Sequence, residues 1–186
     1  MVVSVYKRLY DTVFSDFWKN TMPCPFALFG LPEQFSVDTA ALDTRYRELA
    51  AQFHPDRAAA ASVFEQKQAV MMSAAVNEAY RVLRHPLERA AYLLKKQNID
   101  ADAPEHTQFA PEFLMKQMAW REQLAEAETA AELSALRDET AADFAALLDE
   151  LQAAFAAAQY DVAAQLLRQG RFIDKMMREI KTKLPE

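Results

Sequence analysis

A proline flanked by an imidazole and a carboxylate, in His54-Pro55-Asp56, is the part of this sequence best suited to chemistry or recognition. The proline ring fixes the backbone, and the side chains on both sides can form hydrogen bonds with a partner. The loop that holds the tripeptide is expected at the surface, because buried loop backbone would lack hydrogen-bond partners. Exposed and rigid polar groups suit recognition better than packing, although His54 could instead serve only to cap a neighbouring helix.

Patterns typical of catalytic and metal sites are otherwise missing from the sequence. The three histidines, His54, His85 and His106, and the single cysteine, Cys24, are too few and too scattered for a zinc site. Two glycines cannot form a phosphate-binding loop or a dinucleotide-binding turn. We interpret Cys24 as a bystander and His106 as a solvated residue. The sequence therefore predicts no catalytic residue, no metal site and no cofactor, and a protein that is not an enzyme.

The composition predicts an all-α fold with a substantial core. Hydrophobic residues make up 52% of the 186 residues, and only two residues are glycine. Ala, Leu, Glu, Gln and Met, which lose little conformational freedom in a helix, are abundant. The net charge of −6 argues against a nucleic-acid-binding protein, because such proteins need clustered cations.

The cysteine content and the hydropathy pattern favour a cytoplasmic protein. A single cysteine excludes a disulfide framework within the chain and fits a reducing compartment. No apolar run approaches the roughly 18 residues needed to cross a bilayer.

Residues 1–21 are interpreted as an N-terminal extension. They lack the apolar region and the cleavage site of a signal peptide. Two alternatives stay open: an amphipathic helix, or a poorly ordered segment that is not native and precedes a true start at Met22. The first rests on aromatic residues at helical spacing, which are Tyr6, Tyr10, Phe14 and Phe17.

Two helices of opposite direction are expected to present the tripeptide. Asp38 is a good N-cap for the first, which must end near Phe53 because a proline follows His54. Ser62 and Glu65 form a capping-box pattern at the start of the second. Each helix has a row of apolar residues at helical spacing, which comprises Leu42, Tyr46, Leu49 and Phe53 in the first and Ala69, Met72, Val76, Ala79 and Leu83 in the second.

Shorter helical segments are expected on either side of this pair. Pro25 suits the first turn of one short helix, and Gly30 suits its end. Another helical segment covers Leu87 to Lys96. Residues 97–110 lose helical periodicity and are interpreted as a linker between two domains.

Three further helical patterns follow this linker. The first runs from Pro111 to about Glu128, the second opens with a capping-box pattern at Thr129 and Glu132, and the third opens at Asp161. Short connections imply antiparallel neighbours, and hence a three-helix bundle. The faces expected to be buried comprise Phe113, Gln117, Trp120, Leu124 and Ala127, then Leu133, Leu136, Thr140, Phe144, Leu147 and Leu151, then Val162, Leu166, Ile173, Met176 and Ile180.

The first helix of this bundle carries large apolar residues away from its buried face. Leu114, Met115 and Met118 lie roughly 100–200° around the helix from the buried row. Glu122 and Glu126 continue the same side. The pattern indicates a docking patch with an acidic border, because Met adapts its shape at binding surfaces. The alternative is burial of these residues against the first domain or the linker.

Residues 23–85 resemble a J-domain, on the basis of the His-Pro-Asp loop, the pair Tyr46-Arg47 before it, and Asn77-Glu78-Ala79-Tyr80-Arg81-Val82-Leu83 after it. The resemblance implies two antiparallel helices that present the loop to a DnaK-type chaperone and bias the chaperone ATPase toward hydrolysis. The first helix is less basic than in many J-domains, which weakens electrostatic steering. The residues implied in this contact are His54, Pro55, Asp56, Tyr46, Arg47 and Arg57.

From about residue 22 onward, the chain resembles the HscB type of J-protein, which serves iron–sulfur cluster assembly. The resemblance rests on Arg84-His85-Pro86-Leu87-Glu88-Arg89-Ala90-Ala91-Tyr92-Leu93-Leu94 and Arg171-Phe172-Ile173-Asp174-Lys175. Ala119 departs from the family, which can carry an acidic contact there. The resemblance implies that a scaffold protein for cluster assembly binds Leu114, Met115, Met118, Glu122, Glu126 and Phe172.

We therefore predict a co-chaperone that stimulates an HscA/DnaK-type ATPase and delivers the cluster scaffold to it for maturation of iron–sulfur proteins. The expected domains are a J-domain with its connecting helix over residues 22–96, the linker over 97–110, and a scaffold-binding bundle over 111–186. Neither a nucleic acid nor a membrane is an expected partner. The alternatives are a J-protein with a different client and a structural helical bundle whose His-Pro-Asp is accidental.

Overall fold

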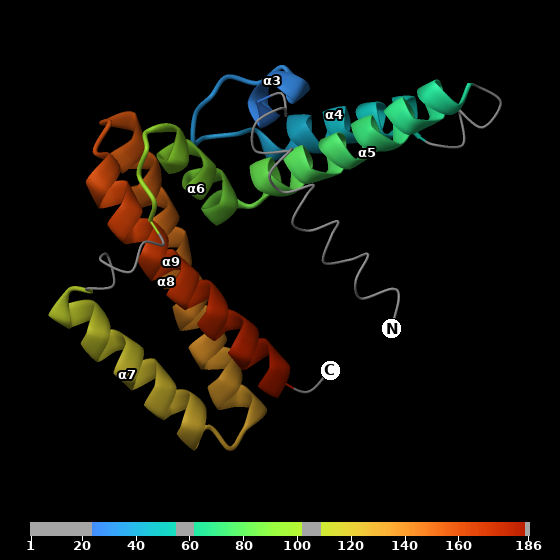
Figure 1. Ribbon diagram of the computed structural model, residues 1–186. Coiled ribbons are helices and arrows are strands. Elements are labelled where there is room, and N and C mark those ends of the chain that lie inside the picture. The colour runs from blue at the N-terminus through green and yellow to red at the C-terminus, as the bar shows by residue number, and fades with distance from the viewer. Residues whose placement is uncertain (1–23, 55–61, 102–108, 185–186) are drawn as a thin grey trace, which may run out of the picture. The chain divides into compact units, whose positions relative to one another are not determined.

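The computed structural model describes residues 24–54, 62–101 and 109–184, and every regular element within these ranges is a helix (Figure 1). This result confirms the predicted all-α fold. The predicted extension over residues 1–21 lies outside the described residues. The helices are α3 (Pro25–Phe29), α4 (Thr39–Gln52), α5 (Val63–Arg84), α6 (Pro86–Lys96), α7 (Pro111–Glu126), α8 (Ala130–Ala156) and α9 (Tyr160–Lys183).

The chain divides into two compact units. The first unit comprises Met1–Glu33 and Val37–Arg84, and its described helices are α3, α4 and α5. The second comprises Gln34–Ser36 and His85–Glu186, with α6 to α9.

The boundary between the units differs from the expected linker over residues 97–110, because α6 belongs to the second unit. The apolar face of α6, which includes Ala90 and Leu94, is buried in the core of that unit, and α6 packs against α9. The sequence pattern predicts α6 as a helix, but periodicity does not indicate which neighbour its apolar face meets. Ala101, within the expected linker, is also buried in this core.

The first unit is built around the antiparallel helices α4 and α5. The Asp38 carboxylate accepts hydrogen bonds from the backbone N–H groups of Ala40 and Ala41, so it caps α4 as predicted. At the start of α5, the Glu65 carboxylate accepts from the Ser62 N–H at 2.8 Å, while the Ser62 hydroxyl accepts from the Glu65 N–H at 3.3 Å. The predicted capping box is therefore present. The buried core residues of these two helices are Leu42 and Leu49 in α4 and Ala75, Val76, Ala79 and Leu83 in α5.

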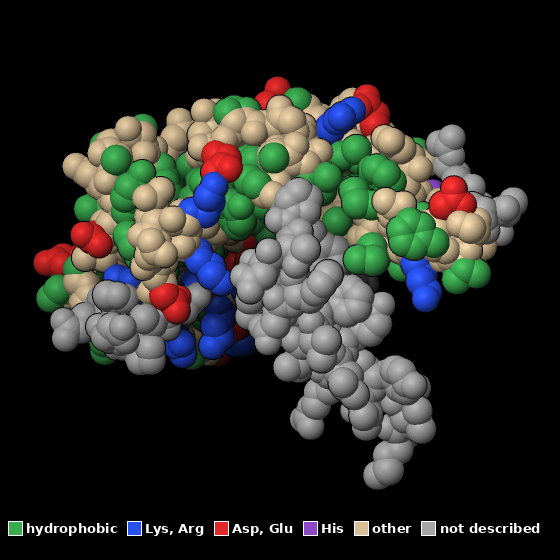
Figure 2. Space-filling view, turned by 45° about the horizontal axis from the view of Figure 1, so that its top comes forward, with side chains coloured by type: hydrophobic (Ala, Val, Ile, Leu, Met, Phe, Trp, Pro, Cys, Tyr) green, Lys and Arg blue, Asp and Glu red, His purple; other side chains and the backbone are tan. Residues whose placement is uncertain are grey.

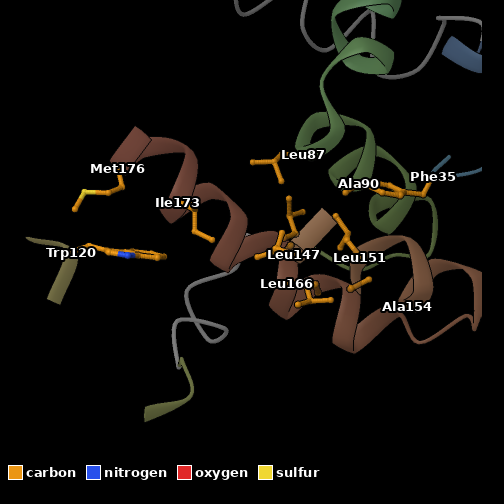
Figure 3. Packing of buried hydrophobic residues seen from close by; sticks show 14 of the residues in the cluster. Phe35, Leu87, Ala90, Trp120, Leu147, Leu151, Ala154, Leu166, Ile173 and Met176 are labelled. Atoms are coloured by element: carbon orange, nitrogen blue, oxygen red, sulfur yellow. The ribbon is translucent and has the colours of Figure 1, made fainter. Parts of the chain in front are cut away.

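The second unit has a continuous core to which all four of its helices contribute (Figure 3). The predicted capping box of Thr129 and Glu132 starts α8. Gly170 marks a close approach of α6, α8 and α9, since an added Cβ would lie 2.8 Å from Leu87 Cδ2 and 3.0 Å from Leu147 Cδ2. The predicted three-helix bundle is thus closed on one side by a fourth helix.

One buried residue of the second unit comes from the segment between α3 and α4. The ring of Phe35 stacks on Phe155 with centroids 5.2 Å apart. Arg89, only 6% exposed, donates from Nε to the Phe35 carbonyl at 2.7 Å and places its guanidinium 5.1 Å from the centroid of the Phe35 ring. The hydrogen bond and the cation–π contact compensate for the burial of this charge.

One predicted core residue is wrong. Val162 was expected to point inward, but it is 44% exposed, whereas Leu166, Ile173, Met176 and Ile180 are buried. Val162 lies in the first turn of α9, where Ala163 and Ala164 are the residues that face the core. None of the described helices is both long and apolar enough to span a membrane.

Candidate functional site

The first candidate site begins where α4 ends. The N–H of Phe53 donates to the Leu49 carbonyl and closes the last turn of α4, and the next residue, His54, is exposed. Pro55, Asp56 and Arg57 lie outside the described residues. The structure therefore places His54 at the surface, at the end of the α4–α5 pair, where the sequence predicts it.

Tyr46, the first predicted contact residue on α4, faces α5. Its hydroxyl donates to Asn77 Oδ1 at 2.9 Å, and its ring stacks on Tyr80 with centroids 4.0 Å apart. Tyr46 is half-buried by these contacts, so it joins the two helices as well as contributing to their surface. An aromatic pair of this kind adds stability beyond the area that it buries.

Arg47, the second predicted contact residue on α4, is exposed and lies along its own helix. Its Nε donates to the Asp43 carbonyl at 3.2 Å, and a terminal nitrogen donates to the Thr44 hydroxyl at 3.2 Å. These bonds reach one turn back along α4. The guanidinium is therefore oriented near the helix surface, where a partner with acidic groups can reach it.

A second polar link fixes α5 against α4. The Tyr80 hydroxyl donates to Asp43 Oδ1 at 2.9 Å, and Arg84 Nε lies 3.2 Å from the same oxygen. The hydrogen bond to Asp43, followed by burial and the charge of Asp43, raises the pKa of the Tyr80 phenol above its ordinary value. This link could not be predicted from the sequence, because Asp43 and Tyr80 have no local pattern in common.

The second candidate site lies on the outer side of α7. Leu114, Met115 and Met118 are 43%, 63% and 71% exposed, whereas Trp120, which faces the core, is 1% exposed. The side chains therefore divide between the two faces as the helical spacing predicts. Glu122 and Glu126 are also exposed, and their spacing from Met115 and Met118 places them on the same side of the helix.

Polar side chains hold α7 in place against α8. Trp120 Nε1 donates to Glu139 Oε1 at 3.0 Å. Lys116 Nζ lies 2.6 Å from Asp143 Oδ1 and 5.4 Å from the centroid of the Trp120 ring. These contacts orient the inner face of α7, and its outer face is thereby presented to solvent.

Phe172, the predicted contact residue on α9, is less accessible than the patch on α7. Its ring packs edge-on against Phe113 with centroids 6.0 Å apart and lies 5.5 Å from the Arg121 guanidinium. It is half-buried. Arg121 follows Leu114 by seven residues, so both lie in one row of α7 and Phe172 borders that row. Arg121 is thus a candidate contact residue that the sequence analysis did not name.

The described side chains of the two surfaces do not include a cluster that could bind a metal ion. Among the residues that the structure describes, no group of three or more His, Cys, Asp or Glu side chains could hold a metal ion. Cys24 donates from its thiol to Glu33 Oε1 at 2.9 Å.

Comparison with known families divides the chain between residues 92 and 109, after most of α6. Residues 24–92 match the model of the DnaJ domain, and residues 109–181 match the model of the HscB C-terminal oligomerisation domain. The first match contains His54, and the second contains α7 and its exposed patch.

Curated relatives match most of the chain. The co-chaperone protein HscB homolog of Neisseria meningitidis serogroup C is 54% identical over 162 residues, which cover 86% of this chain and 98% of the relative. The homolog of Bordetella petrii is 42% identical over 162 residues, with 86% and 95% covered.

Solved structures of two further relatives have the same fold. Chaperone HscB from Vibrio cholerae has a TM-score of 0.76 and 37% sequence identity, with 86% of this chain and 96% of that chain covered. The human co-chaperone protein HscB has a TM-score of 0.81 and 30% identity, with 88% and 83% covered.

Proposed function

Because the chain belongs to the HscB family of J-domain co-chaperones, we propose that its two surfaces connect a DnaK-type chaperone with an iron–sulfur cluster scaffold protein. The protein is a co-chaperone that stimulates the chaperone ATPase and serves the maturation of iron–sulfur proteins. It acts through contacts, and the bond-breaking chemistry belongs to the chaperone.

The exposed position of His54 beyond the last turn of α4 is the observation that carries the chaperone site. An imidazole at the end of two packed helices can reach a partner without any rearrangement of the core. The stacked pair Tyr46 and Tyr80 keeps these helices in register. Tyr46, Arg47, His54, Pro55, Asp56 and Arg57 would contact the ATPase and favour its hydrolysis-competent state, which is a shift of population rather than a chemical step in this chain.

The exposed patch on α7 supports binding of the scaffold protein. Monomeric proteins seldom leave three adjacent large apolar side chains exposed on one helix face without a binding role. Leu114, Met115 and Met118 would form the apolar centre of the contact, with the carboxylates of Glu122 and Glu126 at its border and Phe172 at its edge. Ala119, exposed within the same row, offers no charge to the partner.

In this proposal, the protein is an adaptor that holds two partners on different units. The scaffold, with its iron–sulfur cluster as cargo, would bind the second unit while the chaperone engages the first. Binding both at once would raise the local concentration of scaffold at the chaperone and promote cluster transfer.

The test is a steady-state ATPase assay with an HscA-type chaperone, with and without the scaffold protein. We expect His54→Gln to remove stimulation at every concentration tested, because the imidazole contact is lost while the helices remain. Circular dichroism should show unchanged helicity, and scaffold affinity measured by calorimetry should equal that of the unmodified chain. Full stimulation by His54→Gln would contradict the assignment of this loop.

A further inference from the structure

The outer face of α5 carries an apolar stripe that the fold does not require. Val63, Phe64, Val70 and Met71 are 68%, 74%, 49% and 44% exposed. Val70 and Met71 follow Val63 and Phe64 by seven residues each, so all four lie on one side of the helix. The buried row of α5, centred on Val76 and Leu83, lies roughly 160° away around the helix. Packing of the first unit therefore does not explain this stripe.

The stripe lies at the same end of the hairpin as His54. Tyr46 bonds to Asn77 and Asp43 bonds to Tyr80, and both pairs have the same antiparallel register. In this register, Gln52, the last residue of α4, lies roughly opposite Met71. The first two turns of α5 therefore extend past the end of α4, which His54 follows (Figure 1).

A capping box stabilises the start of this part of α5. The capping box of Ser62 and Glu65 fixes the first turn, which carries Val63 and Phe64. Lys67 is exposed and, by its spacing, lies in the middle of the stripe. Figure 2 shows hydrophobic side chains gathered on the surface of the hairpin. The result is an apolar strip about 12 Å long with one central cation.

We propose that the stripe formed by Val63, Phe64, Val70 and Met71 is a second contact surface for the DnaK-type chaperone. The inference rests on the proposed function of the loop. We assign the chaperone to this stripe because the stripe lies at the same end of the hairpin as His54. A stable interface also covers about 800 Å² on each partner, which is much more than a tripeptide offers. A partner seated on the loop extends over the adjoining turns of α5. The matching chaperone surface is apolar, with an acidic group that faces Lys67.

The double substitution Phe64→Gln with Met71→Gln tests this proposal in the full-length chain. Glutamine keeps the length and the helix propensity of the side chain but removes its apolar character. The dependence of ATPase stimulation on co-chaperone concentration should shift, with the half-maximal concentration raised about tenfold and the maximal rate unchanged. His54→Gln, by contrast, should abolish the maximal rate, because the stripe supplies affinity and the loop supplies the switch.

Two matched variants serve as controls. Gln68→Ala changes an exposed residue of α5 outside the stripe, and Val162→Gln removes an apolar side chain of 44% exposure from α9. Both should leave the half-maximal concentration unchanged. Amide hydrogen exchange gives a second measurement on the unmodified chain, in which residues 63–71 should gain protection when the chaperone binds.

The outcomes separate this inference from the function on which it rests. If His54→Gln abolishes stimulation while the double variant behaves like the unmodified chain, and residues 63–71 gain no protection, the loop assignment stands and the stripe proposal is wrong. If the double variant changes only the oligomeric state in sedimentation, the stripe contacts a second copy of the chain, which also overturns the proposal. If His54→Gln stimulates fully, the function itself fails.

Discussion

The two candidate surfaces differ in how the fold presents them. The chaperone site is at the end of a helix, where the exposed His54 follows the last turn of α4. The scaffold site is the face of one helix, with Trp120 buried on the opposite side. Activation at the chaperone site is expected to depend on His54 and its loop, whereas a site on a helix face distributes its affinity over several side chains and depends on how the helix packs. The two should therefore respond differently to substitution.

The largest expected effect tests whether the two units unfold independently of each other. Trp120→Ala removes the largest buried side chain of the second unit and should lower the free energy of unfolding of that unit by about 3–5 kcal/mol. Hydrogen exchange should show faster opening of α7, α8 and α9, with α4 and α5 unchanged. Leu42→Ala, at a fully buried position of α4, is the reciprocal control and should destabilise only the first unit. Equal loss of protection in both units would show that they unfold together.

An intermediate effect tests whether scaffold affinity is distributed over several side chains on the outer face of α7. Changing Leu114, Met115 and Met118 together to Ala should weaken scaffold binding at least thirtyfold, because truncation of a single central contact residue costs about 2 kcal/mol. Calorimetry measures this loss. Stimulation of the chaperone without scaffold should be unaffected, since the substitutions lie in the second unit. Normal scaffold affinity in this variant would rule out the patch.

The smallest expected effect concerns the hydrogen bond from Tyr80 of α5 to Asp43 of α4. The raised pKa of Tyr80 means that the folded state binds the phenol proton more tightly than the unfolded state. This contribution to stability is complete below the ordinary tyrosine pKa of about 10 and is lost as the pH rises through the higher pKa of the folded state. The melting temperature should therefore fall slightly less between pH 8 and pH 11 in Tyr80→Phe, which keeps the stacked ring. Tyr160→Phe in the second unit is the control, and an identical pH dependence for unmodified and Tyr80→Phe chains would contradict the assignment.

Local signals in the sequence predicted the helix starts and the faces of the helices. The caps at Asp38, Ser62 and Thr129 use side chains within three residues of the groups that they bind, so the sequence contains the whole interaction. The exposure of Met115 and Met118 follows in the same way from helical spacing. The comparisons confirm the predicted family and fold.

Contacts between residues distant in the sequence could not be predicted. Phe35 and Arg89 meet across 54 positions, and no local pattern marks Phe35 as part of the second unit. The packing of α6 against α9 could not be predicted for the same reason. The stripe at Val63, Phe64, Val70 and Met71 does have a local signal, because helical spacing places these four residues on one side of α5. The roles of the predicted contact residues remain predictions that the variants above can test.

The glycine at position 170 limits how this protein can be divided. A helix interior loses stability when it contains glycine, and here the missing side chain makes room for Leu87 of α6. A fragment that begins at Pro111 would expose this seam of α9 to water, and its leucine-lined surface would favour aggregation. Studies of the isolated C-terminal half therefore need a fragment that starts no later than His85, so that α6 still covers the seam.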